Sequence, residues 1–181
     1  VHDLLGVEIT PEGDNVVSLT QTAYIEKMSA QWFPNGVSPN VQSNKTPCDD
    51  GIDKMVLDAV LDETTRSTEL LRNYQSLVGA LIYTSTNTRP DVAYAVGMLC
   101  RAMAKPTPEL MNAALRVLGH LYRTRALGLR YEADRLPVRG MSDSNRATKH
   151  STTGWVFMYN SAAVSWASAK QKSVALSSCE A

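Results

Sequence analysis

The sequence predicts an α+β fold, and three observations support that prediction. Apolar residues recur at helical spacing across residues 70–125, which is the pattern of amphipathic helices. Runs rich in β-branched and apolar residues lie before and after that region and are typical of strands. Apolar residues make up 44% of the 181-residue chain and charged residues 20%, which favours a globular protein over a disordered one. We expect a β-hairpin, then a three-helix subdomain, then a β-sheet.

The first part of the chain predicts the hairpin and one helix. Residues 4–9 and 16–19 are expected to be strands, because residues 11–15 between them include Gly, Asp and Asn, which favour a turn. Residues 34–53 contain three prolines and predict a loop. Residues 22–33 are expected to form a helix, because four large apolar residues share one helical face: Tyr24, Ile25, Met28 and Trp32.

The middle of the chain carries the clearest helical pattern. After a short helix expected at 55–61, apolar residues between 70 and 82 predict a long amphipathic helix. Pro90 at a first-turn position, with Asp91 near the positive end of the helix dipole, predicts the start of the next helix. The Thr-Pro-Glu run at 107–109 opens a third helix in the same way. Three helices with short joints predict a small helical subdomain.

The pattern changes to strands after Gly128. Ser177 and Glu180 have the spacing of a capping box, the usual first turn of a helix. A helix that stops in its first turn cannot pack, and the chain begins at Val1 within an apolar run. We therefore expect an internal piece of a longer protein. Strands are expected at 128–132, 137–143, 153–159, 163–166 and 174–176.

Charge and cysteine content exclude some classes of function. The formal net charge is zero, so overall charge indicates no particular partner. Acids dominate 49–69 and bases dominate 105–149, a pattern of either a basic nucleic-acid surface or two solvated faces. Three widely separated cysteines without a Cys-x-x-Cys pair argue against a zinc site or disulfide framework. No apolar run approaches the roughly 20 residues that span a bilayer, so we expect no membrane partner.

Asp143 is the candidate catalytic and metal-binding residue. It lies at the end of an expected strand, and a strand hairpin and a helix with an acidic start follow it. Two-metal nucleases begin their sites in this way, because two Mg²⁺ ions about 4 Å apart must be held by several carboxylates. One aspartate makes an incomplete site, and the other acid downstream, Glu180, is already assigned to the helix cap. Alternatively, Asp143 bonds local backbone at a strand-end turn.

Five basic residues are candidates for nucleic-acid binding. Lys170 and Lys172 flank a glutamine beside Trp166 and could contact phosphates, although a polar hairpin turn also explains them. The guanidinium groups of the last expected helix pair well with phosphate, although a solvated helix face explains them equally well. These three arginines are Arg116, Arg123 and Arg125.

Several runs along the chain are recognisable together. The run at 87–96 reads Asn-Thr-Arg-Pro-Asp-Val-Ala-Tyr-Ala-Val, and the run at 151–157 reads Ser-Thr-Thr-Gly-Trp-Val-Phe. The others lie at 74–83, 114–118, 128–131, 163–166 and 170–178, with further matches at 5–9, 19–21 and 24–25. In this order they resemble the Copia-type retrotransposon Pol polyprotein over essentially the whole chain.

The resemblance implies an RNA-directed DNA polymerase followed by a ribonuclease H domain, both Mg²⁺-dependent. Residues 1–69 would end the reverse transcriptase palm and begin the thumb, and 70–132 would form a helical thumb or connection. Residues 133–181 would then be a truncated ribonuclease-H-like domain with an incomplete mixed β-sheet. The implied partners are the RNA/DNA template–primer duplex and the rest of the polyprotein. The implied location is cytoplasmic, in a virus-like particle, or nuclear.

The departures from the family limit what the chain alone is expected to do. The polymerase's Tyr-x-Asp-Asp motif belongs upstream of Val1. Asp143 matches the first metal-binding aspartate of the ribonuclease H, but the Trp-Ala-Gly-Asp run that usually follows is missing. The next metal-binding glutamate would come directly after Ala181, with Glu180 as the capping residue.

We therefore expect this chain to bind no Mg²⁺ tightly, to lack polymerase and nuclease activity, and to contribute only template–primer binding. The alternatives are a decayed element remnant, a non-enzymatic nucleic-acid-binding module, or an unrelated interaction module.

Overall fold

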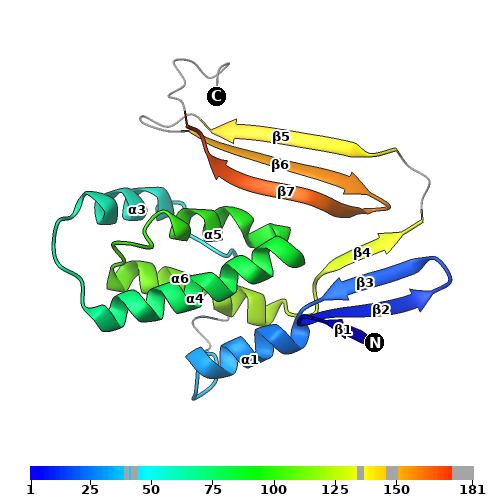
Figure 1. Cartoon of the computed structure of the whole chain (residues 1–181), viewed down its shortest axis with the longest axis horizontal. Coiled ribbons are helices and arrows are strands. Elements are labelled where there is room, and N and C mark those ends of the chain that lie inside the picture. Colours follow the sequence, from blue (N-terminus) through cyan, green and yellow to red (C-terminus); the bar gives the residue numbers. More distant parts are fainter. Residues whose placement is uncertain (39–40, 42–44, 134–136, 146–150, 173–181) are drawn as a thin grey trace.

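The computed structural model describes residues 1–38, 41, 45–133, 137–145 and 151–172. Within them the chain forms helices and two antiparallel sheets, which confirms the α+β prediction. Figure 1 shows the helices gathered on one side of the molecule, with one sheet at their end and the other lying along them.

The first sheet contains four antiparallel strands in the order β1-β2-β3-β4. The expected single strand at 4–9 is wrong, because a turn at Leu5 and Gly6 reverses the chain inside it. Both residues have positive φ, 55° and 81°, as hairpin turns that match the strand twist require. The expected hairpin to β3 is confirmed, with a turn shorter than 11–15. The strands are β1 (His2–Leu4), β2 (Val7–Gly13), β3 (Val16–Thr20) and β4 (Leu129–Glu132).

The helices follow the predicted order. Ser67 and Thr107 lie directly before two of them, and each accepts a hydrogen bond from a backbone N–H of the first turn, which stabilises the helix start. The helix expected from Pro90 begins as the short 3₁₀ helix η1 (Pro90–Val92). The α-helices are α1 (Thr22–Trp32), α3 (Ile52–Leu61), α4 (Thr68–Asn87), α5 (Ala93–Cys100) and α6 (Pro108–Arg123).

The main core lies among these five helices. Tyr74 of α4 is fully buried, and its hydroxyl donates a 2.8 Å hydrogen bond to the carbonyl of Leu99 on α5. Burial raises the pKa of this phenol, so the hydroxyl keeps its proton and its bond at neutral pH. The largest side chains of the core are Ile25, Ile52, Leu77, Leu81, Leu99, Leu110, Leu118 and Leu121.

The second sheet has the order β5-β6-β7, and its described pairings are all antiparallel. Its strands are β5 (Arg139–Asn145), β6 (Thr152–Tyr159) and β7 (Ala162–Lys170), close to the predicted positions. The mixed sheet that the resemblance implies requires strands outside the described residues. The strand expected at 174–176 and the capping box of Ser177 and Glu180 also lie outside them.

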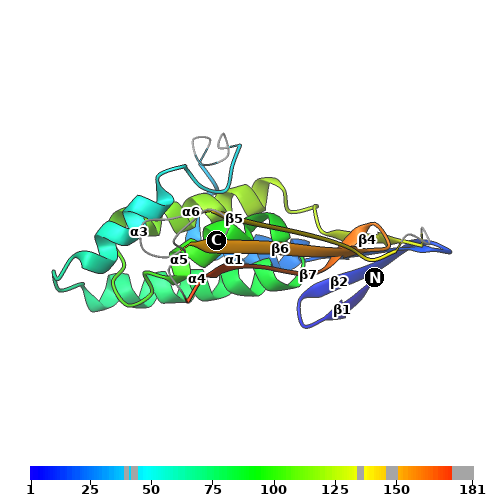
Figure 2. The same ribbon diagram turned by 90° about the horizontal axis from the view of Figure 1, so that it is seen from above.

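Within the described residues, side-chain hydrogen bonds help to attach this second sheet to the rest of the molecule. The indole N–H of Trp166 donates to the Ser85 carbonyl at 2.8 Å. Arg101 donates to the Thr152 hydroxyl at 2.9 Å, and Tyr131 of β4 donates to the Ala163 carbonyl at 2.7 Å. Figure 2 shows the sheet running along the helices from above. No helix among the described residues is long and apolar enough to cross a membrane.

Candidate functional site

A hollow lies between the second sheet and the helices. This sheet hollow has a volume of about 700 Å³ and is lined by residues of η1, α5, β5, β6 and β7. Tyr94 lines its helical side, and burial raises the pKa of its phenol. A protonated phenol in an open hollow can donate a hydrogen bond to a ligand oxygen.

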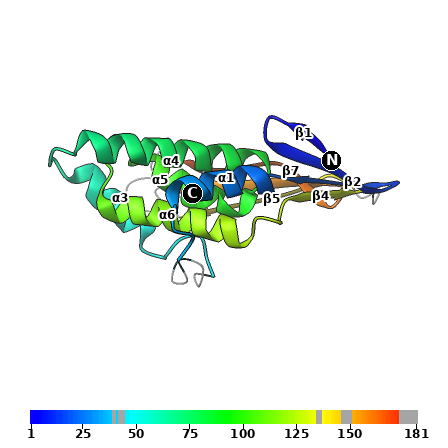
Figure 3. The same cartoon turned by 90° about the horizontal axis from the view of Figure 1, so that it is seen from below.

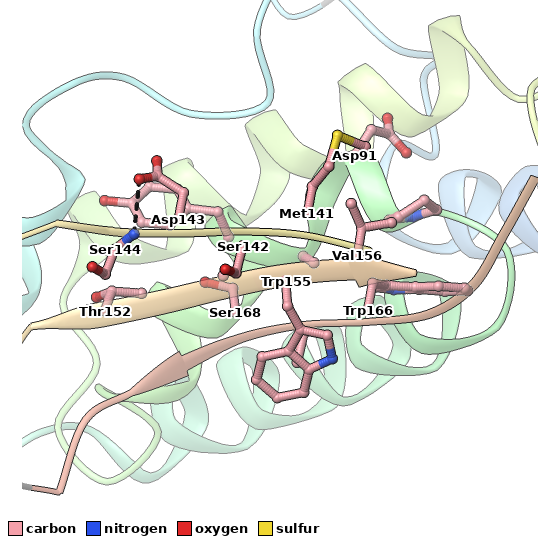
Figure 4. A pocket seen from close by; sticks show the side chains of 15 residues that line it. Asp91, Met141, Ser142, Asp143, Ser144, Thr152, Trp155, Val156, Trp166 and Ser168 are labelled. Carbon is pink, nitrogen blue, oxygen red and sulfur yellow. Dashed lines mark hydrogen bonds between the residues drawn. The ribbon is translucent and has the colours of Figure 1, made fainter. Parts of the chain in front are cut away.

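Asp143 lines the sheet hollow from β5. Alternate residues of a strand share one face, and directly paired residues share it too. Asp143 pairs with Gly154, so it lies on the face of Met141 and Val156. Figure 4 shows Asp143 and Met141 on one side of β5 and the Trp155 indole on the other.

The carboxylate of Asp143 is exposed and bonds locally. Its Oδ1 accepts a 2.8 Å hydrogen bond from the backbone N–H of Ser144. The local backbone bond that the alternative interpretation expects is therefore present. A carboxylate with one such bond still has lone pairs for a cation or a water molecule. The metal-binding role of Asp143 stays a prediction.

The described residues do not make a two-metal site. No group of three His, Cys, Asp or Glu side chains in this part of the chain could hold a metal ion. Asp91 also lines the sheet hollow, but both its oxygens are engaged by Arg89. Glu180 lies outside the described residues. Asp143 alone does not satisfy the several carboxylates that a pair of Mg²⁺ ions needs.

Asp91 belongs to a polar cluster that sequence reasoning missed. Arg89 is 1% exposed and donates from Nε and Nη2 to the two Asp91 oxygens at 2.8 and 2.7 Å. It also donates to the backbone carbonyl and the hydroxyl of Thr124 at the end of α6. His120 Nε2 lies 3.2 Å from Asp91 Oδ2. We call Arg89, Asp91, His120 and Thr124 the Arg89 cluster.

The charge of Asp91 follows from these contacts. Burial opposes its ionisation, but hydrogen bonds from Arg89 and His120 outweigh burial and hold the pKa of the carboxyl below its ordinary value. Arg123 lies 3.3 Å from the other ring nitrogen of His120. Because a guanidinium can only donate, that Nδ1 accepts and Nε2 carries the proton. The Arg-Pro-Asp spacing was the one sequence signal for this cluster.

The three candidate arginines, two on α6 and one directly after it, make contacts within the chain. Arg116 forms an ion pair with Asp49 and donates to the carbonyl and hydroxyl of Thr46. Arg123 donates to the Lys45 carbonyl at 3.3 Å. These bonds connect α6 to the segment before α3. The binding role of both arginines stays a prediction.

Arg125 connects α6 to α1 instead. Its Nε donates to a Glu26 carboxylate oxygen at 2.8 Å, and its Nη1 donates to the Tyr122 carbonyl at 3.0 Å. The guanidinium carbon lies 4.7 Å from the centre of the Tyr122 ring, a favourable cation–π distance. Figure 3 shows α1 beside α6 from below. The binding role of Arg125 also stays a prediction.

The two candidate lysines lie near Asp143. One row across the three strands contains Asn145, Thr152 and Lys170. It lies two residues along the strands from the row that contains Asp143. Lys170 therefore shares the face of Asp143, and strand geometry puts their Cα atoms on the order of 12 Å apart. Both Lys170 and Lys172 are exposed. We call Asp143, Lys170 and Lys172 the Asp143 end of the sheet.

Three curated proteins show what the chain is similar to. It is 42% identical over 112 residues to secreted RxLR effector protein 161 of Plasmopara viticola, covering 59% of this chain and 79% of that protein. It is 30% identical over 185 residues to an uncharacterized mitochondrial protein of Arabidopsis thaliana, covering 99% of this chain and 72% of that protein.

The third relative is much longer than the chain. It is the retrovirus-related Pol polyprotein from transposon TNT 1-94 of Nicotiana tabacum, 37% identical over 112 residues. The match covers 60% of this chain and 8% of the polyprotein. No protein-family model matches the chain, and no solved structure is significantly similar to it.

Proposed function

Because the chain belongs to the family of Copia-type retrotransposon Pol polyproteins, we propose that it contributes an RNA–DNA hybrid-binding surface to such a polyprotein. The proposed surface is the Asp143 end of the sheet. In this proposal, residues 1–69 and 70–132 belong to the reverse transcriptase and its connection. Residues 133–181 then begin the ribonuclease H domain, and the working location is a cytoplasmic virus-like particle or the nucleus.

The observation that carries the proposal is the placement of one carboxylate and two exposed cations on one end of one sheet. Lys170 and Asp143 share a face, and Lys172 follows directly after the strand. Lysines that neutralise phosphates release counterions, which drives sequence-independent binding. The open hollow beside Asp143 gives a backbone access to that carboxylate.

Cleavage of the hybrid requires more than these residues supply. Asp143 would be one ligand of the Mg²⁺ ions of the parent enzyme, and Mg²⁺ would polarise the scissile phosphate there. The remaining carboxylates would come from other parts of the polyprotein. We therefore propose that this chain binds the hybrid and does not cut it.

Amide hydrogen exchange with and without a short RNA–DNA hybrid tests the binding surface. Slower exchange is expected at 139–145 and 166–172, with little change over α3. The experiment is repeated at higher salt, where binding and protection should both weaken. Protection confined to α3, or no protection anywhere, would contradict the proposal.

A second candidate function is a non-enzymatic nucleic-acid-binding module. In this second candidate the exposed lysines bind nucleic acid and Asp143 takes no part in a metal site. The two candidates differ in what Asp143 does. Mg²⁺-dependent hybrid cleavage by this chain that is lost in Asp143→Asn would contradict both candidates, because neither lets this chain cut the hybrid.

A further inference from the structure

A smaller hollow lies between α1, the loop that follows it, and α6. This α1 hollow has a volume of about 300 Å³, large enough for one planar ring system with its hydration. Its walls are mainly apolar, and two polar side chains, Glu26 and Ser29, also line it. The apolar walls come from Ala30, Phe33, Pro34, Val37 and Tyr122.

Ser29 is the unusual member of this lining. It is 2% exposed, and its hydroxyl has no hydrogen-bond partner within the described part of the chain. Buried hydroxyls are normally hydrogen-bonded, since an unmade bond costs free energy. Because Ser29 lines the α1 hollow, a molecule that enters the hollow is a candidate partner for this hydroxyl.

Arg125 contacts two of the residues that line the α1 hollow. It pairs with Glu26 and lies over the ring of Tyr122, and both of these residues line the hollow. Its Nη2 makes no hydrogen bond to another described residue. Guanidinium groups bind phosphate oxygens through such free N–H groups.

We propose that the α1 hollow binds the base of an unpaired nucleotide, with its phosphate against Arg125. The base would stack on Tyr122 and Phe33, and aromatic stacking suits any base. The Ser29 hydroxyl would bond a polar edge of the base, and the Glu26 carboxylate would accept from an exocyclic amino group. The inference rests on the proposed function, because it takes nucleic acid as the partner and adds a second contact to it.

The chemistry of the walls favours this occupant over others. An apolar side chain of a protein partner would leave the Ser29 hydroxyl unpaired. A water molecule would satisfy Ser29 but would not use the aromatic walls or the free N–H of Arg125. A nucleotide with an amino-bearing base uses all of them.

The experiment titrates the full chain with cytidine monophosphate and follows chemical shifts by NMR. Uridine monophosphate, which lacks the amino group, and inorganic phosphate are the matched probes. Cytidine monophosphate is expected to shift residues of α1 and Tyr122 and to bind most tightly of the three. Ser29→Ala is expected to weaken it by about fivefold, the usual effect of one hydrogen bond.

The free chain supplies a second readout. Ser29→Ala removes an unpartnered hydroxyl, so its Tm is expected to stay equal or rise. Ser76→Ala, at an exposed position of α4, is the control: it should raise Tm slightly through the higher helix propensity of alanine and leave binding unchanged. A lower Tm for Ser29→Ala would show that the hydroxyl has a partner in the free chain and would overturn the inference.

Two further outcomes separate this inference from the proposed function. If cytidine monophosphate does not bind, or binds Ser29→Ala equally well, the nucleotide site is wrong while hybrid binding at the Asp143 end of the sheet still stands. If the nucleotide binds as expected but a hybrid does not slow amide exchange at 139–145, the nucleotide site in the α1 hollow is supported and the proposed sheet surface is wrong.

Discussion

The last helix and the second sheet use their positive charges in opposite ways. On α6 and directly after it, the three arginines each donate to acceptors elsewhere in the chain, and they are Arg116, Arg123 and Arg125. At the end of the second sheet, Lys170 and Lys172 are exposed. In the sequence both sets were candidates for phosphate binding, so composition alone did not separate cations that hold the fold from cations that are exposed for binding.

The choice of residue fits the two roles. Arg presents several donors in a planar arrangement that suits carbonyls and carboxylates, whereas the Lys ammonium is compact and strongly hydrated. Arg89 shows the first role most fully, because it is buried and holds Asp91 and Thr124 together. Arginines thus hold the helical part of the chain together, whereas the lysines at the Asp143 end of the sheet are exposed to solvent.

Arg89→Ala should have the largest effect on this comparison. It leaves the Asp91 carboxylate and the Thr124 carbonyl without their buried partner, and breaking such a pair costs about 3 kcal/mol or more. The free energy of unfolding, measured by urea denaturation, should fall accordingly. Arg72→Ala, at an exposed position of α4, should stay within about 0.5 kcal/mol of the parent. If Arg89→Ala lowers the free energy of unfolding by less than Arg72→Ala does, the Arg89 cluster does not stabilise the fold.

Asp91→Asn should have the next largest effect and should depend on pH. The folded-state pKa of Asp91 is depressed, so its contribution is fully present above the unfolded pKa of about 3.9. That contribution is lost as pH falls through the folded-state value. The stability gap between parent and Asp91→Asn should therefore be constant near neutral pH and close in acid. A gap that widens on acidification would contradict the assignment.

Trp166→Phe tests how firmly the second sheet is attached to the helices. It removes the indole N–H that bonds the Ser85 carbonyl and keeps most of the apolar contact, so a loss of about 1 kcal/mol is expected. Hydrogen exchange should accelerate in β5–β7 and not in α4. Equal acceleration in both would show that sheet and helices unfold as one unit.

Arg116→Ala should have the smallest effect on stability. Its partners lie near the surface, where an ion pair contributes about 0–1 kcal/mol. The comparison predicts that hybrid affinity stays unchanged, because this arginine is occupied within the chain. If Arg116→Ala markedly lowers hybrid affinity without lowering stability, Arg116 belongs to the surface that binds the hybrid.

The sequence was informative where the signal is local. The α4 and α6 helices could be predicted because apolar spacing and the capping residues Ser67 and Thr107 lie within a few residues of one another. The turn at Leu5 and Gly6 was missed because it interrupts an apolar run. Its glycine was the one available signal.

The candidate site was predictable only in part. Asp143 falls on a strand as expected, since the alternating pattern around it is local. The partners of Arg116 and Arg125, by contrast, are up to 99 positions away in the sequence. Contacts over such separations depend on tertiary packing, which one sequence does not reveal.

The salt dependence of hybrid binding tests the central claim most directly. The logarithm of affinity falls with the logarithm of salt concentration, with a slope set by the number of phosphates contacted. Replacing Lys170 and Lys172 together with alanine should reduce that slope by about 2, one for each lost contact. Replacing Lys27 and Lys54, exposed on α1 and α3, should leave it unchanged. Equal slopes for all three proteins would contradict the claim that the end of the second sheet carries the interaction.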